Sequence, residues 1–389
     1  MKRYNTEDVT DKEFIEKAIN FATKGKKHRR EVAYVLANKQ FYINALQRMI
    51  INRTFKPSKP RRIEMIDKAS GKLRVIYCPP FFPDQCFHHI MMFAAVPVLM
   101  KGMSAHVYAS VPNRGALYGK RFIRRWLDTD RKNTKYVAKL DIKKFYPSIP
   151  HDKLLAKLHS KFKNKDLLYM IDCFVNGHEE TPGRGIAIGF YPSQWFSNFY
   201  LQNLDHFVKE QLHVKYYGRY MDDIVFFGGN KKILHEQTKQ IIAYLEAEGL
   251  TVKENWQVFR FDYIRKRDGK RCGRDLDFMG FRFYRDKTTL RRRNALRIRR
   301  AVKQARKQRL ISTHRAASII SYYGWIKYTD SWHYNEKYVG GVISLTALKL
   351  IISRGQRLEN QRKIERKCKL YENYKHQTTA TTSARTRDG

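Results

Sequence analysis

Two adjacent acids stand between two apolar, β-rich stretches near the middle of the chain. Asp222 and Asp223 follow residues 216–221 and precede residues 224–227. Adjacent carboxylates at the tip of a buried hairpin repel each other in a low dielectric, so a cation is expected beside them. A third acid, Asp141, lies in another apolar stretch. Because magnesium prefers hard carboxylate oxygens, the sequence predicts a divalent-cation site formed by two strands.

A central strand and a hairpin must position these acids. In the strand predicted at 137–142, alternation places Ala138, Leu140 and Ile142 on one face. Asp141 then faces the other way, towards a cleft. Carboxylates from two strands that hold a pair of magnesium ions are the arrangement that nucleotide polymerisation requires, because the ions carry a triphosphate and a primer 3′-hydroxyl.

Hydrophobic periodicity and breaker residues predict the surrounding elements. They are helices within 11–53 and at 85–100, strands at 61–67 and 73–78, a mixed stretch at 105–119, a helix at 151–162, a glycine-rich loop at 181–191, helices at 193–212 and 231–248, and a strand or tight hairpin at 276–284. Ser193 is the predicted N-cap of the helix at 193–212.

The composition points to a polyanionic partner. The 389 residues carry a formal charge of +42, and nucleic acid is the first candidate for such a surplus. The alternative is a ribosomal-type binding protein or a solvated basic surface. No apolar stretch reaches the ~18 residues of a membrane span, and no signal peptide opens the chain, so we expect a cytoplasmic protein without a membrane partner. The five cysteines form no CxxC pair, which indicates neither a zinc site nor a disulfide framework.

Basic helices follow the predicted hairpin at 276–284. Arginines accumulate from Arg291 onward on a predicted helix, and further helices are expected at 313–328 and 345–367. The polar residues near the C-terminus predict disorder.

Taken in order, these segments resemble a reverse transcriptase between about residues 28 and 335. The loop from Ile188 to Gln194 begins with Ile-Gly and ends with Ser-Gln, where most of the family has Gln-Gly and Ser-Pro. This variant, and the segment Ser321-Tyr322-Tyr323-Gly324-Trp325, resemble the enzymes of diversity-generating retroelements. The resemblance implies an α+β right-hand polymerase. N-terminal helices and fingers would occupy 1–138, the palm 139–284 with a fingers segment at 160–185, an all-α thumb 285–370 and a disordered tail 371–389.

The resemblance also implies catalytic roles. Asp141 and Asp222, with Ile142, would bind two Mg²⁺ ions, and Asp223 would support the metal site. Lys253 matches the position of a lysine that protonates the leaving pyrophosphate, although an ordinary surface lysine is equally compatible with the sequence.

Five positions are implied to bind the incoming nucleotide: Lys72, Arg74, Tyr146, Gly189 and Gln194. Lys72 and Arg74 lie two apart on a predicted strand, so they share a face that could grip a triphosphate or simply face solvent. Tyr146 would exclude a 2′-hydroxyl, unless it is a core aromatic residue. Gly189 would let the backbone approach template and nucleotide closely, whereas the alternative is an ordinary junction between loop and helix.

Further positions are implied to contact template or primer. They are Arg114, Gly115, Ile188, Met221, Gly280, Arg291, Arg293 and Arg300. The arginines after residue 290 suit the phosphates of an RNA–DNA hybrid, which is recognised by shape.

By this resemblance the chain would copy a template-repeat RNA into cDNA from deoxynucleoside triphosphates and misincorporate opposite adenines. It would work with a small, basic, oligomeric accessory variability protein. Two alternatives within the family are a group II intron enzyme, although the Cys and His clusters of its nuclease domain are absent, and a retron enzyme, although 152–184 lacks the Asn-Ala-x-x-His signature. A non-catalytic RNA-binding protein on the same scaffold is the alternative of another class.

Overall fold

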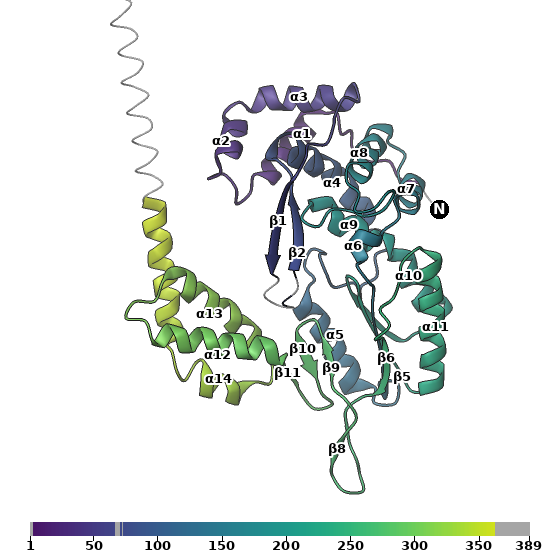
Figure 1. The fold of residues 1–389 in the computed structure, drawn as a ribbon, viewed down its shortest axis with the longest axis vertical. Helices are drawn as coiled ribbons and strands as arrows, with labels where there is room; N and C mark the ends of the chain where they lie inside the picture. Colours follow the sequence, from purple (N-terminus) through teal and green to yellow (C-terminus); the bar gives the residue numbers. More distant parts are fainter. Residues whose placement is uncertain (1–2, 67–70, 72, 362–389) are drawn as a thin grey trace, which may run out of the picture. The chain divides into compact units, whose positions relative to one another are not determined.

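The computed structural model describes residues 3–66, 71 and 73–361. The chain divides into two units (Figure 1). The first contains the residues up to Met279 together with Phe283–Asp286, and the second contains Gly280–Arg282 and the residues from Lys287 onward.

A four-stranded antiparallel sheet of order β4-β5-β3-β6 lies at the centre of the first unit. Its strands are β3 (Tyr136–Asp141), β4 (Tyr216–Tyr220), β5 (Asp223–Gly228) and β6 (Gln257–Arg260). β4 and β5 form the predicted hairpin, and β3 pairs with β5 so that Asp141 lies opposite Asp223. Helix α11 (Lys231–Ala247) packs on β3, β5 and β6. Leu234, Ile241 and Leu245 are its buried apolar residues.

A helical layer and a two-stranded ribbon make up the N-terminal part of this unit (Figure 1). The ribbon pairs β1 (Arg61–Ile66) with β2 (Leu73–Cys78), and its side chains are exposed or half-buried. Helix α4 (Cys86–Leu99) is buried along most of its length and packs on helices α1, α8 and α9. The helices of this layer are α1 (Lys12–Ala22), α2 (Arg30–Ala37), α3 (Lys39–Ile51), the π-helix η1 (Phe81–Gln85), α7 (His151–Lys161) and α8 (Lys165–Asn176).

The remaining elements of the first unit connect these two parts. They are α5 (Ala116–Thr129), α6 (Phe145–Ser148), α9 (Tyr191–Tyr200), α10 (Gln202–His206), the π-helix η2 (Phe207–Gln211), β7 (Tyr263–Ile264), β8 (Arg271–Cys272) and β9 (Leu276–Phe278). The sequence predicted a mixed stretch up to residue 119 and so missed the start of α5 at Ala116, where Gly115 takes a φ of 141°.

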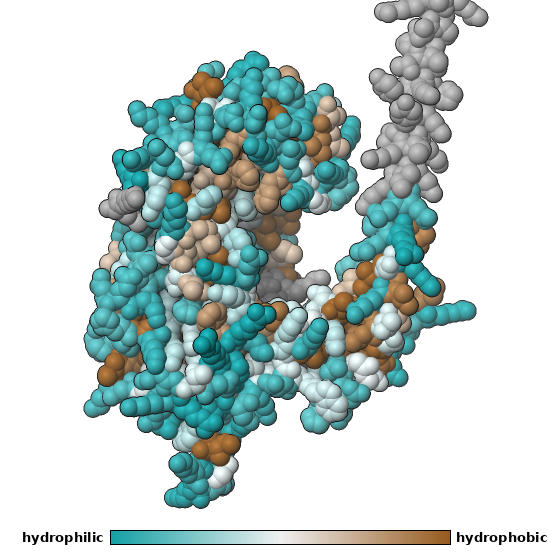
Figure 2. All heavy atoms as spheres, turned by 180° about the vertical axis from the view of Figure 1, so that it is seen from behind, coloured by the Kyte–Doolittle hydropathy of each residue, from teal (hydrophilic) through white to brown (hydrophobic). Residues whose placement is uncertain are grey.

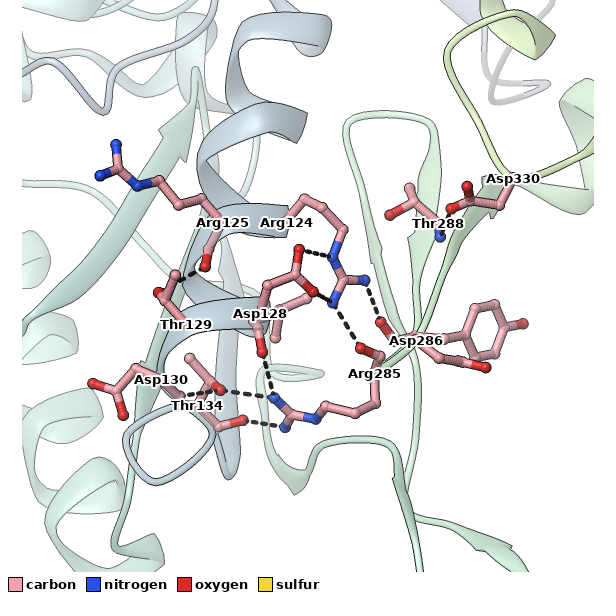
Figure 3. A network of polar contacts seen from close by, with 12 residues as sticks. Arg124, Arg125, Asp128, Thr129, Asp130, Thr134, Arg285, Asp286, Thr288 and Asp330 are labelled. Atoms are coloured by element: carbon pink, nitrogen blue, oxygen red, sulfur yellow. Dashed lines mark hydrogen bonds and ion pairs between the residues drawn. The ribbon is translucent and has the colours of Figure 1, made fainter.

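Two arginines attach the short segment Phe283–Asp286 to the first unit (Figure 3). Arg124 on α5 donates to the carbonyl oxygens of Tyr284 and Arg285, both at 2.7 Å, and its guanidinium also binds Asp128. Arg285 donates to the hydroxyl and the carbonyl oxygen of Thr134, at 2.9 and 2.8 Å. The bonds of Arg124 thus satisfy two backbone carbonyl oxygens of this segment.

The second unit is mainly helical. α12 (Arg292–Arg306) packs against α13 (Thr313–Ile326), and α14 (Trp332–Tyr338) and a helical stretch at 345–361 follow. Ile298, Val302 and Ala305 form the buried face of α12, which is the apolar spacing of an amphipathic helix. A short strand β11 (Thr288–Leu290) precedes α12, and the preceding strand β10 (Phe281–Phe283) spans the boundary between the units. Hydrophilic residues cover much of the surface seen in Figure 2, with scattered apolar patches.

Several predicted elements differ from the structure in an informative way. The helix expected at 193–212 begins earlier, at Tyr191, and is divided into α9, α10 and η2. The prediction that Ser193 caps it is wrong: its hydroxyl donates to the carbonyl oxygen of Ala187 at 2.6 Å, and Phe190 takes the N-cap position. The predicted tail at 371–389 lies outside the described residues. Among the residues that are described, no helix is both long and apolar enough to cross a membrane.

Candidate active site

The three acids lie at one end of the central sheet. Asp141 is the last residue of β3 and pairs in register with Asp223, the first residue of β5. Asp222 lies in the two-residue loop before β5, and its carbonyl oxygen accepts from the backbone N–H of Ile142 at 3.2 Å. Met221, the other loop residue, takes a φ of 59°. Strand pairing therefore brings together acids that are about 80 positions apart in the chain.

Burial makes this acidic end electrostatically costly. It raises the pKa of Asp223 to about 7, with the neighbouring charge of Lys139 opposing the shift and those of Asp141 and Asp222 adding to it. The Lys139 Nζ lies 3.5 Å from one carboxylate oxygen of Asp223. The other oxygen, Oδ1, is buried and accepts no hydrogen bond from any residue in the described part of the chain. Burial and the charge of Asp141 also raise the pKa of Asp222, with Lys253 and Arg74 among the groups that oppose the shift.

Lys253 reaches Asp141 through both its backbone and its side chain. Val252 forms an antiparallel bridge with Ile142, and the Lys253 N–H donates to the carbonyl oxygen of Asp141 at 2.9 Å. The Lys253 ammonium also binds the Asp141 carboxylate directly. The structure thus places Lys253 beside the acids, whereas the sequence alone left a surface lysine equally possible.

A cavity of about 360 Å³ opens beside these residues. Its lining includes Lys139, Asp141 and Lys253, as well as Trp256, Arg274 and Asp277. Lys139 lies two residues before Asp141, on the same face of β3, and donates to the carbonyl oxygen of Asp277 at 2.6 Å. Ala138, Leu140 and Ile142 are buried, in agreement with the alternation expected from the sequence.

Tyr146 and Arg74 lie close enough to Asp222 to interact with it electrostatically. Burial raises the pKa of Tyr146 to about 12; the charge of Asp222 adds to the shift, while a hydrogen bond with Ser197 and the charge of Arg74 oppose it. Arg74 lies on β2, so the structure brings this residue of the ribbon into the same electrostatic environment as the acids. Lys72 lies outside the described residues.

The glycine loop contacts the ribbon directly. The Tyr77 N–H donates to the carbonyl oxygen of Ile188 at 2.8 Å. Gly189 takes a φ of 111°, and a Cβ atom there would lie 2.7 Å from Ile76 Cγ2 and overlap the Tyr77 carbonyl oxygen. The close approach that requires glycine is therefore to strand β2. Gln194 is exposed on α9.

The other implied contact residues fall into two groups. In the first unit, Arg114 donates to the carbonyl oxygens of Ser104 and Val107, at 2.5 and 3.1 Å, so part of its guanidinium stabilises the loop before α5. In the second unit, the Arg291 N–H donates to the carbonyl oxygen of Gly280 at 3.0 Å, and Arg293 and Arg300 are exposed on α12.

Sequence reasoning missed the charged residues around the acids. Lys139 could have been found, because it shares a strand face with Asp141. Arg219 could not, because it lies within a stretch that was interpreted as apolar. It is on hairpin strand β4, is fully buried and binds Asp205.

Residues 66–282 match the family described as reverse transcriptase (RNA-dependent DNA polymerase). The match covers more than half of the chain, and the chain therefore belongs to the reverse transcriptase family. Its mixed architecture of helices and antiparallel sheet is that of a right-hand polymerase. The division of the first unit into fingers and palm, and the role of the second unit as a thumb, stay predictions.

Among curated proteins, the chain is similar to an uncharacterised 91 kDa protein in a cob intron of Schizosaccharomyces pombe, with 30% identity over 158 residues. That match covers 39% of this chain and 19% of the relative. Among solved structures, it is similar to telomerase from Candida albicans in complex with an RNA fragment (TM-score 0.38, 14% identity, 57% of this chain and 43% of that chain). A second similar structure is apo telomerase from Candida tropicalis, with a TM-score of 0.40 and 15% identity. That match covers 59% of this chain and 48% of the telomerase chain. The chain thus spans about a fifth of the curated relative and less than half of either telomerase chain.

Reverse transcriptases use divalent metal ions. The acids fit such an ion in two respects: their oxygens are hard donors, and the buried Oδ1 of Asp223 has no hydrogen-bond donor among the described residues. The described residues hold no group of three or more acids, histidines or cysteines already arranged as a closed ligand set. Lys253 instead neutralises Asp141.

Proposed function

We propose that this chain is an RNA-directed DNA polymerase in which Asp141 and Asp222, supported by Asp223, hold two magnesium ions for nucleotidyl transfer. The observation that carries the proposal is the in-register pairing of Asp141 with Asp223 at a buried sheet end where burial and neighbouring acids raise carboxyl pKa values. Structural carboxylates seldom remain in such a place without a cation, since burying like charges together is unfavourable.

When bound, the magnesium ions would lower the pKa of the primer hydroxyl and neutralise the leaving pyrophosphate. Asp141 and Asp222 would hold them, and Asp223, beside Lys139, would support the site. Lys253 would give a proton to the pyrophosphate, and the ion pair of its ammonium with the Asp141 carboxylate supports this role. This proton donation would make Lys253 a general acid.

Tyr146 and Arg74 would select and orient the nucleotide. The Tyr146 ring lies near Asp222 and is half-buried, so it could abut the sugar and exclude a 2′-hydroxyl. Arg74 could bind phosphate oxygens in a bidentate manner. Gln194 is exposed at the start of α9 and would face template or nucleotide.

Primer extension on an RNA template tests the polymerase assignment. Asp222→Asn keeps the shape of the side chain and removes its charge, so extension should fall by roughly a thousandfold while binding of an RNA–DNA hybrid persists. Asp268→Asn is the matched control, because Asp268 lies in an exposed turn and pairs only with Arg265 among the ion pairs found in the described residues. Full activity of the Asp222→Asn enzyme would refute the site, and hybrid binding without any extension by the wild-type chain would favour the non-catalytic alternative.

We further propose the diversity-generating retroelement subtype, which would copy a template-repeat RNA with errors opposite adenines and recruit a small basic accessory protein. The loop from Ile188 to Gln194 supports it. Sequencing of cDNA made by the purified enzyme measures errors at each template base. An error rate at adenines no higher than at the other bases would remove the mutagenic assignment.

A group II intron enzyme is the second candidate, and similarity to a protein in a fission yeast cob intron favours it. The DNA next to the coding sequence distinguishes the two candidates. A pair of near-identical repeats that differ at adenines would support the retroelement subtype, and flanking intron sequence would support the alternative.

A further inference from the structure

Hairpin strand β4 contributes to a buried charged cluster that the proposed chemistry does not use. The Arg219 guanidinium and the Asp205 carboxylate form a bidentate ion pair, with Nε–Oδ1 and Nη2–Oδ2 distances of 2.8 and 2.7 Å. Arg219 has no exposed surface, and Asp205 is 1% exposed. A charge buried this deeply is tolerated only where its hydrogen-bonding groups are satisfied.

All five N–H donors of Arg219 have an acceptor. Besides Asp205, the guanidinium donates to the side-chain oxygen of Asn198 at 3.0 Å and to its carbonyl oxygen at 3.3 Å. The remaining donor, on Nη1, reaches the carbonyl oxygen of Met221 at 3.2 Å. The side chain therefore connects α9, α10 and the loop that carries Asp222.

The Met221 carbonyl belongs to the peptide that leads directly into Asp222. Met221 has a positive φ, which costs an L-residue other than glycine about 1–2 kcal/mol. In a two-residue hairpin loop with a positive φ at its first position only, glycine is the usual residue there. This backbone is held from both sides: Arg219 binds the carbonyl before Asp222, and the Ile142 N–H binds the carbonyl of Asp222 itself.

We propose that Arg219 is a positioning residue for the active site, and that its guanidinium fixes the Met221–Asp222 peptide and hence the Asp222 carboxylate for cation binding. The proposal rests on the proposed function of Asp222. The buried cluster then has two sides with different roles. On one side Arg219 binds the Met221 carbonyl oxygen of the loop, and on the other the Tyr217 hydroxyl donates to Asp205 at 2.7 Å without reaching the loop.

Three variants test this asymmetry. Arg219→Lys keeps a positive charge for Asp205 but cannot supply the planar set of donors. The double variant Arg219→Met with Asp205→Leu removes both buried charges together, which avoids leaving either charge unpaired, although the Tyr217 hydroxyl loses its acceptor. This variant leaves Met221 without its donor. Tyr217→Phe is the matched control, because it removes one hydrogen bond from the same buried cluster on the side away from the loop.

Two measurements separate positioning from general destabilisation. Electron paramagnetic resonance measures Mn²⁺ affinity of the protein alone, and primer extension gives kcat and KM for nucleotide. We expect both Arg219 variants to bind Mn²⁺ about tenfold more weakly and to lose roughly ten- to a hundredfold in kcat, as for an ångström-scale displacement of a reacting group. KM should change less than kcat, and Tyr217→Phe should stay within about twofold of wild type in both measurements.

A folded double variant with wild-type Mn²⁺ affinity and kcat would overturn the proposal. So would a Tyr217→Phe variant that loses as much kcat and affinity as Arg219→Lys, because the effect would then follow from the buried cluster as a whole. Failure of the proposed function gives a different result: Asp222→Asn would leave extension unchanged. The Mn²⁺ measurement tests the role of Arg219 even if the wild-type chain extends no primer.

Discussion

Asp223→Asn should stabilise the protein, and by an amount that depends on pH. The Asp223 side chain is 24% exposed, and burial raises its pKa from 3.8 to about 7. Because each pKa unit corresponds to about 1.36 kcal/mol, a raised pKa of this size lowers the free energy of unfolding by about 4 kcal/mol above pH 7. Asparagine has the same shape and no charge, so the variant should recover most of that free energy.

The sign and the pH window follow from proton linkage. Between about pH 3.8 and 7 the folded protein holds the Asp223 proton and the unfolded chain does not, so the stability of wild type falls as pH rises through this range. Below the range the acid is neutral in both states, and above it the penalty is constant. The difference in stability between Asp223→Asn and wild type should therefore grow from near zero at pH 4 to its full value at pH 8.

Urea denaturation at several pH values, without divalent cations, measures this difference. Asp268→Asn serves as the control, since loss of its surface ion pair with Arg265 should cost less than about 1 kcal/mol. Magnesium should narrow the gap between wild type and Asp223→Asn, because a bound cation neutralises the acids that the variant relieves. A variant that is less stable than wild type at pH 8, or a difference that does not change with pH, would refute the electrostatic argument.

Three further outcomes are expected. Gly189→Ala should lower the free energy of unfolding by about 3 kcal/mol in a denaturation experiment, because the new Cβ overlaps strand β2. Gly183→Ala, whose Cβ meets no described atom within 4 Å, should lower it by only the ~1 kcal/mol that a positive φ costs. Tyr146→Ala should raise ribonucleotide incorporation relative to deoxynucleotide incorporation by about tenfold or more, and an unchanged ratio would assign Tyr146 to the core alone. Affinity for an RNA–DNA hybrid should fall by ~10³-fold or more between 50 and 200 mM salt if about six phosphates are contacted, and a flat titration would contradict a basic binding surface.

The sequence was sufficient to predict the strand and the hairpin that carry the acids, because the apolar residues of these strands pack against one another. Leu140 pairs with Ile224 and Ala138 pairs with Phe226, all buried. A slip of one residue would break these buried pairs and exchange the two faces of each strand, so the pairs contribute to fixing the register. Asp141 must then meet Asp223. Sequence reasoning anticipated that the acids converge but could not supply the partner of each residue, because pairing depends on both strands at once.

The helix that supports the hairpin shows where local reasoning fails. Residues 193–212 have helical periodicity, and Ser193 is a favourable cap in isolation. In the structure the hydroxyl of Ser193 is used by the glycine loop, and the helix breaks near Leu201, so that Asp205 lies on a separate short helix. Tertiary contacts therefore override the local preference. The same break places Asp205 where Arg219 can bind it.

The two kinds of buried charge near the hairpin explain why a cation is expected at one place and not at the other. Arg219 has no exposed surface and Asp205 is 1% exposed, yet every donor of the guanidinium is paired, so this cluster needs no further ligand. Asp223, only a few residues away, has a buried oxygen to which no described residue donates, and burial holds its pKa near neutrality. The unfavourable charge therefore lies on the acids at this end of the sheet. Because the neighbouring backbone is bonded to a satisfied ion pair, the hairpin has little freedom to relieve that charge by moving. Below about pH 7 a proton on Asp223 relieves the charge, and above it a bound divalent cation can do so.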